Sequence, residues 1–346
     1  MPFRDVIGHR RLVGLLARSI RRGTLPPSLI FAGPSGVGKR LVAVATAQAL
    51  NCTAISQTAD PVDRVVDHVA LELDACGTCA ACMRIARGVH ADVLIVEPGD
   101  SGSIKIDRVR DIVDRAAYRP FEGRRRVVVV DEADALVPAA QNALLKTLEE
   151  PPSSSVFLLV TSRPDMLLDT VRSRCPRLRF RPLAAGEVAA ALVARGRSAS
   201  EAHAVAANAD GSIGAALEAS AGVLVEARDA ALHVLSQTAS NEGRRPNLDA
   251  ASTLLGKSGG GAASDREQLA IHLRAMGSLL RDIAVVGAGA NGALVANPDV
   301  RPALERLSAY RGERGVRAFA AVDRALAALD RNAGVKTVAD WVTVNL

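Results

Sequence analysis

The sequence contains no uninterrupted apolar stretch of the roughly 20 residues that a membrane-spanning helix requires. Its N-terminal segment, MPFRDVIGHRR, is charged and lacks the apolar core of a secretory signal peptide. These two absences exclude the usual routes into or across a membrane. We therefore expect a cytoplasmic protein that makes no membrane contact.

Aromatic residues make up only 3% of the chain, which disfavours base stacking on an aromatic platform as a mode of nucleic-acid recognition. The formal net charge of +6 favours a polyanionic partner only mildly. Arginine clusters at Arg124–Arg126 and at Arg172 and Arg174 could contact phosphates, but such clusters are more often solvated faces of helices and strands. Charge alone therefore does not establish DNA binding.

The composition is that of a folded protein, with 49% hydrophobic and 23% charged residues. A chain of 346 residues is too long for one ordinary core, so we expect two or three domains.

Apolar runs and helical patterns alternate through the first half of the chain. The apolar runs are LIFA (29–32), DVLIVEP (92–98), RRRVVVV (124–130) and VFLLVTS (156–162). The helical patterns cover 8–22, 40–51, 106–118, 138–150 and 165–173. Such alternation predicts a parallel sheet covered by helices on both faces. From about residue 183 alanine-rich helical patterns take over, with a glycine-rich loop predicted at 256–264.

The segment GPSGVGKR at 33–40 fits the phosphate-binding pattern G-x-x-x-x-G-K and stands between a predicted strand and a helix. In such a loop, glycines allow close backbone approach, N–H groups cradle an anion, and the lysine reaches the β- and γ-phosphates. The next position normally holds a Ser or Thr whose hydroxyl binds Mg²⁺, but here it is Arg40. A glycine-rich turn without a ligand is the alternative. The predicted nucleotide-binding residues are Gly33, Pro34, Ser35, Gly36, Val37, Gly38, Lys39, Arg40 and Thr161.

Asp131 and Glu132 follow the run of four valines. At that place Asp131 could hold Mg²⁺ through water, and Glu132 could orient and deprotonate an attacking water. A solvated strand end is the alternative. The intact acidic pair therefore favours ATP hydrolysis, whereas the absence of a hydroxyl at position 40 opposes it.

Four of the five cysteines lie near one another in the chain. Cys76, Cys79 and Cys82 have the spacing C-x2-C-x2-C, and Cys52 can complete a tetrahedral set. Four thiolates in a closed shell suit structural Zn²⁺. An iron–sulfur cluster or free thiols are the alternatives, although the further Cys-Pro of the bacterial ferredoxin pattern is missing. The distant Cys175 is predicted to be a small buried residue.

Several longer motifs carry a family resemblance. LIFAGPSGVGK, CGTCAACMRIARGVHADVLIVEP, NALLKTLEEPP and VFLLVTSRPDMLLDTVRSRC together resemble the bacterial sliding-clamp loader subunits of DNA polymerase III, which are AAA+ proteins. The matching motifs span 5–182. The resemblance implies a RecA-like AAA+ module at 1–182 with a zinc insertion at about 52–90, a helical lid at 183–224 and a helical collar at 225–346.

Two branches of that family compete. The gamma/tau motor subunits carry a complete phosphate loop, whereas the delta-prime stator often has a degraded one. Arg40 favours delta-prime. So does Gly214, which stands in GSIGAAL where the motor subunits have an arginine. The pair Asp131-Glu132 leaves room for ATP or ADP binding and keeps a working motor or another AAA+ ATPase as the alternative.

The resemblance also implies a role for Arg174 in the Ser-Arg-Cys motif: an arginine finger inserted into the ATP site of a neighbouring motor subunit. An ordinary surface arginine is the alternative. The implied partners are gamma/tau and delta subunits in a hetero-oligomer, the sliding clamp and primed DNA. We expect neither polymerase nor ATPase activity from the chain alone. A redox or iron–sulfur protein is a third, weaker interpretation.

Overall fold

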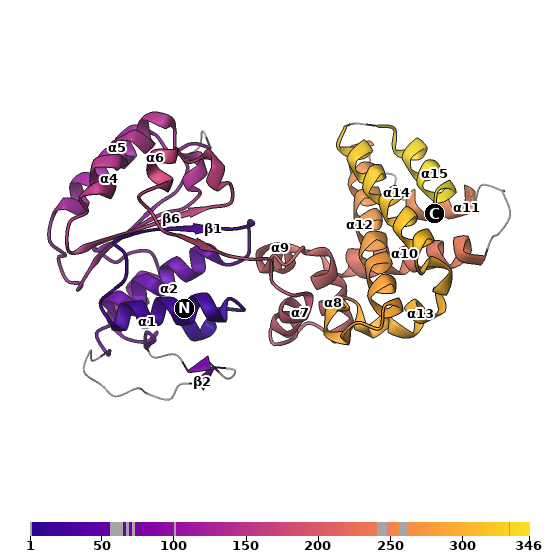
Figure 1. The fold of residues 1–346 in the computed structure, drawn as a ribbon, viewed down its shortest axis with the longest axis horizontal. Helices are drawn as coiled ribbons and strands as arrows, with labels where there is room; N and C mark the ends of the chain where they lie inside the picture. Colours follow the sequence, from indigo (N-terminus) through magenta and orange to yellow (C-terminus); the bar gives the residue numbers. More distant parts are fainter. Residues whose placement is uncertain are drawn as a thin grey trace. The chain divides into compact units, whose positions relative to one another are not determined.

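A computed structural model describes residues 2–55, 65–66, 69–70, 73–99, 102–240, 248–255, 262–331 and 333–346 (Figure 1). The chain forms two compact units, Met1–Pro182 and Leu183–Leu346. The two units are described separately below.

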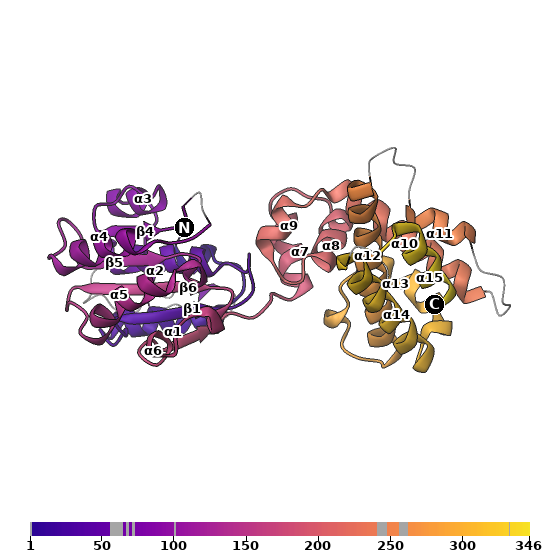
Figure 2. The same ribbon diagram turned by 90° about the horizontal axis from the view of Figure 1, so that it is seen from above.

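The first unit is built on a five-stranded parallel sheet. Its strands are β1 (Ser28–Ala32), β4 (Val93–Val96), β5 (Arg126–Val130), β6 (Ser155–Thr161) and β7 (Arg177–Arg179). Their order across the sheet is β4-β5-β6-β1-β7, which Figure 2 shows for the first four. A separate antiparallel pair, β2 (Val65–Val66) and β3 (Val69–Ala70), lies in the cysteine insertion.

Helices cover both faces of this sheet (Figure 1). The helices of the unit are α1 (Arg10–Arg21), α2 (Lys39–Asn51), α3 (Ala80–Ala86), α4 (Ile106–Ala117), α5 (Pro138–Glu149) and α6 (Asp169–Arg172). Short 3-10 turns occur at Phe3–Asp5, Ala133–Ala135 and Pro164–Met166. One core joins α1 and α2 to alternate strand residues such as Phe31 and Leu158, and the other joins α4, α5 and α6 to their neighbours such as Ile30 and Leu159. Successive strand side chains thus enter opposite cores, as the pleat requires.

The four apolar runs all form strands, and the predicted α/β class with helices on both faces is confirmed. The edge strand β7 was missed by the sequence interpretation because its three residues are arginine, leucine and arginine, with little apolar character. It pairs with β1, and Phe180 just beyond it donates its N–H to the carbonyl of Ala32 at 2.7 Å.

All regular elements among the described residues of the second unit are helices. Its α-helices are α7 (Ala185–Val193), α8 (Ala199–Asn208), α9 (Ile213–Glu218), α10 (Ala221–Ser240), α11 (Leu248–Leu255), α12 (Ala262–Gly287), α13 (Arg301–Arg306), α14 (Glu313–Asp330) and α15 (Val335–Val344). Further 3-10 turns occur at Gly292–Leu294, Pro298–Val300 and Ser308–Tyr310. A single apolar core runs from α10 to α15. Most of the predicted loop at 256–264 lies outside the described residues.

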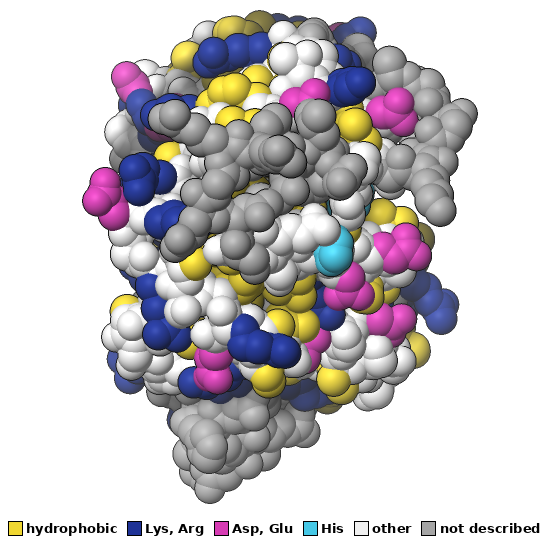
Figure 3. Space-filling view, turned by 90° about the vertical axis from the view of Figure 1, so that its right-hand side faces the viewer, with side chains coloured by type: hydrophobic (Ala, Val, Ile, Leu, Met, Phe, Trp, Pro, Cys, Tyr) yellow, Lys and Arg dark blue, Asp and Glu magenta, His cyan; other side chains and the backbone are white. Residues whose placement is uncertain are grey.

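Local signals explain where some of these helices begin. Ser198 accepts the N–H of Glu201, whose carboxylate in turn accepts the N–H of Ser198, which is a capping box. The side-chain oxygen of Ser212 caps α9 by accepting the N–H of Ala215. Among the described residues, no helix combines the length and apolar character needed to span a bilayer. Where Figure 3 shows described residues on one face of the molecule, basic and acidic side chains are interspersed.

Candidate functional site

The glycine-rich loop lies where the sheet changes the direction of its connections. After β1 the chain enters α2 on one face of the sheet, whereas after the neighbouring β6 it enters α6 on the other face. Ligands of parallel α/β sheets bind outside the carboxyl ends of strands at such a switch point. The sequence-predicted loop therefore stands where a ligand site is expected.

The loop conformation depends on its glycines. Gly36 and Gly38 have φ angles of 71° and 100°, which favour glycine. Gly33 is needed for space, because a Cβ there would lie 2.2 Å from the carbonyl oxygen of Phe180. His9 Nε2 donates to the carbonyl of Val37 at 2.9 Å, which ties the loop to the start of α1.

The loop carries N–H groups that no backbone hydrogen bond uses. Within the described part of the chain, the N–H groups of Gly36, Val37 and Gly38 donate to no other backbone group. The first turn of α2 adds N–H groups that have no hydrogen-bond acceptor within the helix, together with the positive end of the helix dipole. This arrangement suits an anion such as a phosphate.

Lys39 is held against the loop. Its Nζ donates to the carbonyls of Gly33 at 2.8 Å and Pro34 at 2.6 Å, and the residue is buried. Burial lowers the pKa of Lys39, and the negative charges of Asp131 and Asp134 partly oppose that shift. The ammonium therefore stands between the loop and the acidic strand end, as a phosphate-binding lysine would.

Arg40 forms ion pairs with two carboxylates. Its Nη1 lies 3.2 Å from Asp131 Oδ2, and its Nη2 pairs with Glu97 Oε1. Glu97 and Asp131 directly follow the paired residues Val96 and Val130 of adjacent parallel strands, so their side chains emerge at the same sheet edge. The sequence interpretation missed Glu97, although the end of the run DVLIVEP gave the signal.

Magnesium does not fit this arrangement. A phosphate-loop enzyme holds Mg²⁺ with the loop hydroxyl and the acidic strand-end residue. Here the hydroxyl is replaced by a guanidinium, which also pairs with that acidic residue, Asp131. A guanidinium has donors only and remains protonated in proteins, so it cannot ligate a cation.

The remaining acidic residues of the site, Glu132 and Asp134, make different contacts. Glu132 is exposed and has a left-handed φ of 47°, and its N–H donates to Asp131 Oδ1 at 3.0 Å. Asp134 accepts the hydroxyl of Thr161 at 2.8 Å and Arg163 Nε at 2.9 Å. Burial opposes ionisation of Asp134, but the hydrogen bonds from Thr161 and Arg163 outweigh it and lower its pKa. The hydroxyl of the sequence-predicted Thr161 is thus donated to Asp134, a partner that sequence reasoning missed.

Arg174 lies apart from this loop, just after α6. Its Nη1 donates to the carbonyl of Thr170 at 2.8 Å, and its Nη2 pairs with Glu149 Oε1 at the end of α5. The exposed fraction of its side chain is 34%. The next residue, Cys175, is buried in the sheet core, as the sequence predicted.

The four clustered cysteines are brought together. The ligand atoms of Cys52, Cys76, Cys79 and Cys82 all lie within 4.8 Å of one another, and the Cys52 and Cys79 sulfurs are 3.9 Å apart. A tetrahedral zinc site with Zn–S bonds of about 2.3 Å has sulfur separations of about 3.8 Å. The donor set and its spacing therefore fit zinc.

Backbone N–H groups surround these sulfurs. Cys76 N donates to Cys52 Sγ at 3.3 Å, and Cys79 N donates to Cys76 Sγ at 3.2 Å. Burial raises the pKa of Cys79, but hydrogen bonds from Thr53 and Cys82 outweigh it and bring the pKa to about 5. Burial is likewise outweighed at Cys76 by hydrogen bonds, which lower its pKa, whereas burial raises the pKa of Cys52 and of Cys82. The N–H donors therefore favour the metal-binding thiolate form at Cys76 and Cys79.

The N-terminal segment docks on the cysteine loop. Arg4 donates to the carbonyls of Ala75 and Cys76, each at 2.8 Å, and pairs with Asp74 at 3.0 Å. Phe3 N donates to Asp74 Oδ1 at 2.7 Å. The cysteine loop therefore fixes the chain terminus as well as its own residues.

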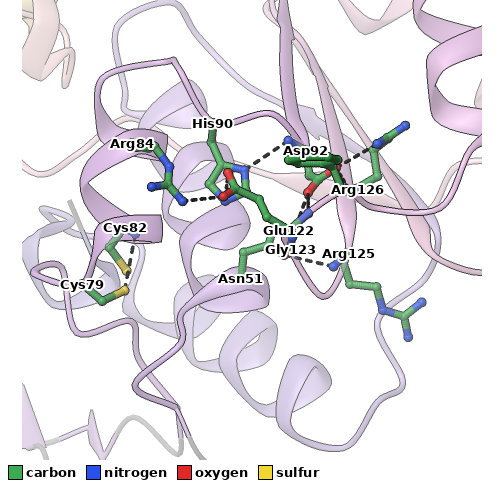
Figure 4. A network of polar contacts seen from close by, with 11 residues as sticks. Asn51, Cys79, Cys82, Arg84, His90, Asp92, Glu122, Gly123, Arg125 and Arg126 are labelled. Carbon is green, nitrogen blue, oxygen red and sulfur yellow. Dashed lines mark hydrogen bonds and ion pairs between the residues drawn. The ribbon is translucent and has the colours of Figure 1, made fainter.

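A polar network ties α3 to the sheet (Figure 4). Arg84 of α3 pairs with Glu122 at 2.6 Å, and His90 Nε2 lies 3.6 Å from the same carboxylate. The fully buried Asp92 accepts the N–H groups of residues 121–123 and pairs with Arg126 at 2.8 Å. Burial opposes ionisation of Asp92, but the bonds from Arg126 and these N–H groups hold its pKa well below the usual range.

Comparison with known proteins identifies the family. A family model described as "DNA polymerase III, delta subunit" matches residues 8–184, just over half of the chain. The chain belongs to this family. It is a DNA polymerase III subunit of the clamp-loader type, related to gamma and tau, and its first unit has the RecA-like AAA+ fold.

Curated relatives match the same half. DNA polymerase III subunit gamma/tau of Mycobacterium tuberculosis (strain ATCC 25618 / H37Rv) is 34% identical over 181 residues, which are 52% of this chain and 29% of that protein. DNA polymerase III subunit tau of Escherichia coli (strain K12) is 34% identical over 182 residues, 52% of this chain and 26% of the relative. The match thus spans less than a third of these relatives' length.

Among solved structures, a DNA polymerase III gamma subunit-related protein from Thermotoga maritima is 16% identical to this chain, with a TM-score of 0.35. The alignment covers 97% of each chain. The strand order of the first unit and the family match support the assignment of its RecA-like fold.

Proposed function

We propose that this chain is the delta-prime subunit, the stator, of the DNA polymerase III clamp loader. In this role it helps the ATP-driven loading of the sliding clamp onto primed DNA without hydrolysing ATP itself. The observation that carries the proposal is the pairing of Arg40 with Asp131 and Glu97. A guanidinium on the acidic residue that should hold Mg²⁺ opposes catalysis at this loop.

Two further residues support the proposal. Gly214 lies in α9, where the motor subunits carry an arginine over the phosphates, and glycine supplies neither charge nor hydrogen bonds. Arg174 is partly exposed just beyond α6 and can present its guanidinium to a neighbouring subunit. In other NTPases an arginine finger raises turnover on the order of 10³-fold or more by stabilising charge on the transferred phosphoryl group.

The domain and partner assignments follow from the same role. Residues 1–182 form the AAA+ module, 183–224 the lid and 225–346 the collar of a hetero-oligomer with gamma/tau and delta subunits. The cysteines at 52, 76, 79 and 82 hold a structural Zn²⁺. Any contact with primed DNA is to backbone phosphates, through helix N-termini and arginines. The glycine-rich loop retains its shape and can hold ATP or ADP without turnover.

A reconstituted loader tests this function. Assembled with gamma/tau and delta subunits, clamp and primed DNA, the Arg174→Ala variant should hydrolyse ATP far more slowly than the natural assembly. Arg172→Ala is the matched control, since Arg172 lies two residues away and pairs with Asp165 and Asp169 of its own segment. Equal turnover by the Arg174 variant and the natural assembly would refute the finger.

A working motor subunit is the second candidate. It is favoured by the retained Asp131-Glu132 pair and by the gamma/tau names of the curated relatives. Magnesium-dependent turnover by the isolated chain separates the two candidates.

A further inference from the structure

We propose that Arg40 is the resident cation of the loop, occupying the place of a divalent ion. The natural chain then binds no divalent cation there, and Glu97 and Asp131 form a cation site only after the guanidinium is removed. This proposal rests on the proposed non-hydrolysing function and deepens it, because it identifies the Arg40 guanidinium as the group that takes the place of the metal ion.

The carboxylates are placed by the sheet rather than by Arg40. Val96 of β4 and Val130 of β5 are register partners, and Asp131 N donates to the carbonyl of Val96 at 2.8 Å. Glu97 and Asp131 each follow directly on one of these paired residues. Two acidic side chains therefore remain neighbours whatever stands at position 40, and their mutual repulsion favours a cation near them.

Arg40 is placed by the loop and the helix. It is the second residue of α2, which starts at Lys39 directly beyond Gly38. From there its guanidinium reaches both carboxylates, with Nη1 3.2 Å from Asp131 Oδ2 and Nη2 paired with Glu97. It therefore contacts the same acidic oxygens that a divalent ion between loop and strand end would use.

The Arg40 guanidinium and a divalent cation cannot occupy this place at the same time. A divalent ion needs oxygen ligands, and Arg40 withdraws one oxygen of each carboxylate while placing a positive charge beside the site. The pairing is intramolecular, and neither dilution nor a chelator removes it.

Manganese binding by the purified, zinc-loaded chain tests the inference directly. Free Mn²⁺ is measured by electron paramagnetic resonance during titration of the natural chain and three variants: Arg40→Thr, Arg40→Lys and Arg40→Thr combined with Asp131→Asn. We expect Arg40→Thr to gain one Mn²⁺ site that is on the order of tenfold tighter than any binding by the natural chain. Arg40→Lys keeps the charge and should gain none, and the double variant should lose the gain.

Two results would overturn the inference. One is a site in the natural chain that binds Mn²⁺ as tightly as Arg40→Thr does. The other is failure of a folded Arg40→Thr chain, verified by circular dichroism, to bind Mn²⁺ more tightly than the double variant. Failure of the proposed function is distinguishable, since it appears as ATP turnover by the isolated chain or as insensitivity of the loader to Arg174→Ala, whatever the manganese result.

Discussion

The guanidinium of Arg174 forms an ion pair with the carboxylate of Glu149, the last residue of α5. Two segments that are distant in sequence, the end of NALLKTLEEPP and the Ser-Arg-Cys motif, thus meet at one surface. The carbonyl of Thr170 holds the other side of the guanidinium. These contacts limit the directions in which the Arg174 guanidinium can point.

If Glu149 positions Arg174, Glu149→Ala should lower ATP turnover of the assembled loader, but by a smaller factor than Arg174→Ala. Glu149→Gln keeps an oxygen acceptor and should retain more turnover than Glu149→Ala. Steady-state hydrolysis across ATP concentrations, in loaders that differ only at these positions, gives the comparison. Faster turnover by Glu149→Ala would mean that the pair restrains the arginine instead.

Removing one clustered thiol should remove the metal. We expect one Zn²⁺ per natural chain and much less than one in Cys82→Ser, together with a lower melting temperature, because the free energy of metal binding contributes to folding. Cys175→Ser is the matched control, since Cys175 is also buried but lies in the sheet core. Elemental analysis and thermal melts give both readouts. Full zinc content in Cys82→Ser would contradict the four-sulfur site.

The buried pair of Asp92 and Arg126 should stabilise the first unit in a pH-dependent way. Asp92→Asn leaves Arg126 buried without a counter-ion, a change that costs about 3–5 kcal/mol in such sites. Because the pKa of Asp92 is lowered by folding, its contribution is present above the unfolded-state value of about 3.9 and is lost as the pH falls from there toward the folded-state value.

Urea unfolding of Asp92→Asn and the natural chain measures this difference. It should be largest near neutral pH and should shrink on acidification, as Asp92 itself becomes protonated. Asp107→Asn removes a highly exposed carboxylate and serves as the control with little effect. A difference that stays constant into strongly acidic pH would contradict the linkage.

The loop should tolerate no side chain at its first glycine. In Gly33→Ala the new Cβ meets the carbonyl of Phe180 at 2.2 Å, so β7 or the loop must move, at about 1–3 kcal/mol. Gly186→Ala, in α7, meets nothing within 4 Å and should be neutral or slightly stabilising. Thermal melts of both variants decide this. Equal melting temperatures for Gly33→Ala and the natural chain would rule out the clash.

The class of the first unit could be predicted because its central strands are buried on both faces and therefore appear as continuous apolar runs. The strand RVVVV is the clearest case. β7 could not be found in this way, since an edge strand of three residues carries two arginines. Its position becomes evident only from its pairing with β1.

The sequence pattern drew attention to individual residues of the candidate site but not to the pairs that they form. The sequence pattern marked Arg40, Asp131 and Arg174 as unusual or functional, yet it did not indicate Glu97 or Glu149 as their partners. Ion pairs between segments about 90 residues apart, such as Arg40 with Asp131, depend on strand order, which a single sequence does not reveal. The cysteine cluster was the exception, because three of its four cysteines lie close together in the sequence.

ATP hydrolysis by the purified chain alone, with Mg²⁺ and primed DNA, tests the central claim most directly. We predict no turnover above background, because the loop lacks its hydroxyl and Arg40 pairs with Asp131. Clear magnesium-dependent turnover, lost in Lys39→Ala, would contradict it and make this chain a motor subunit.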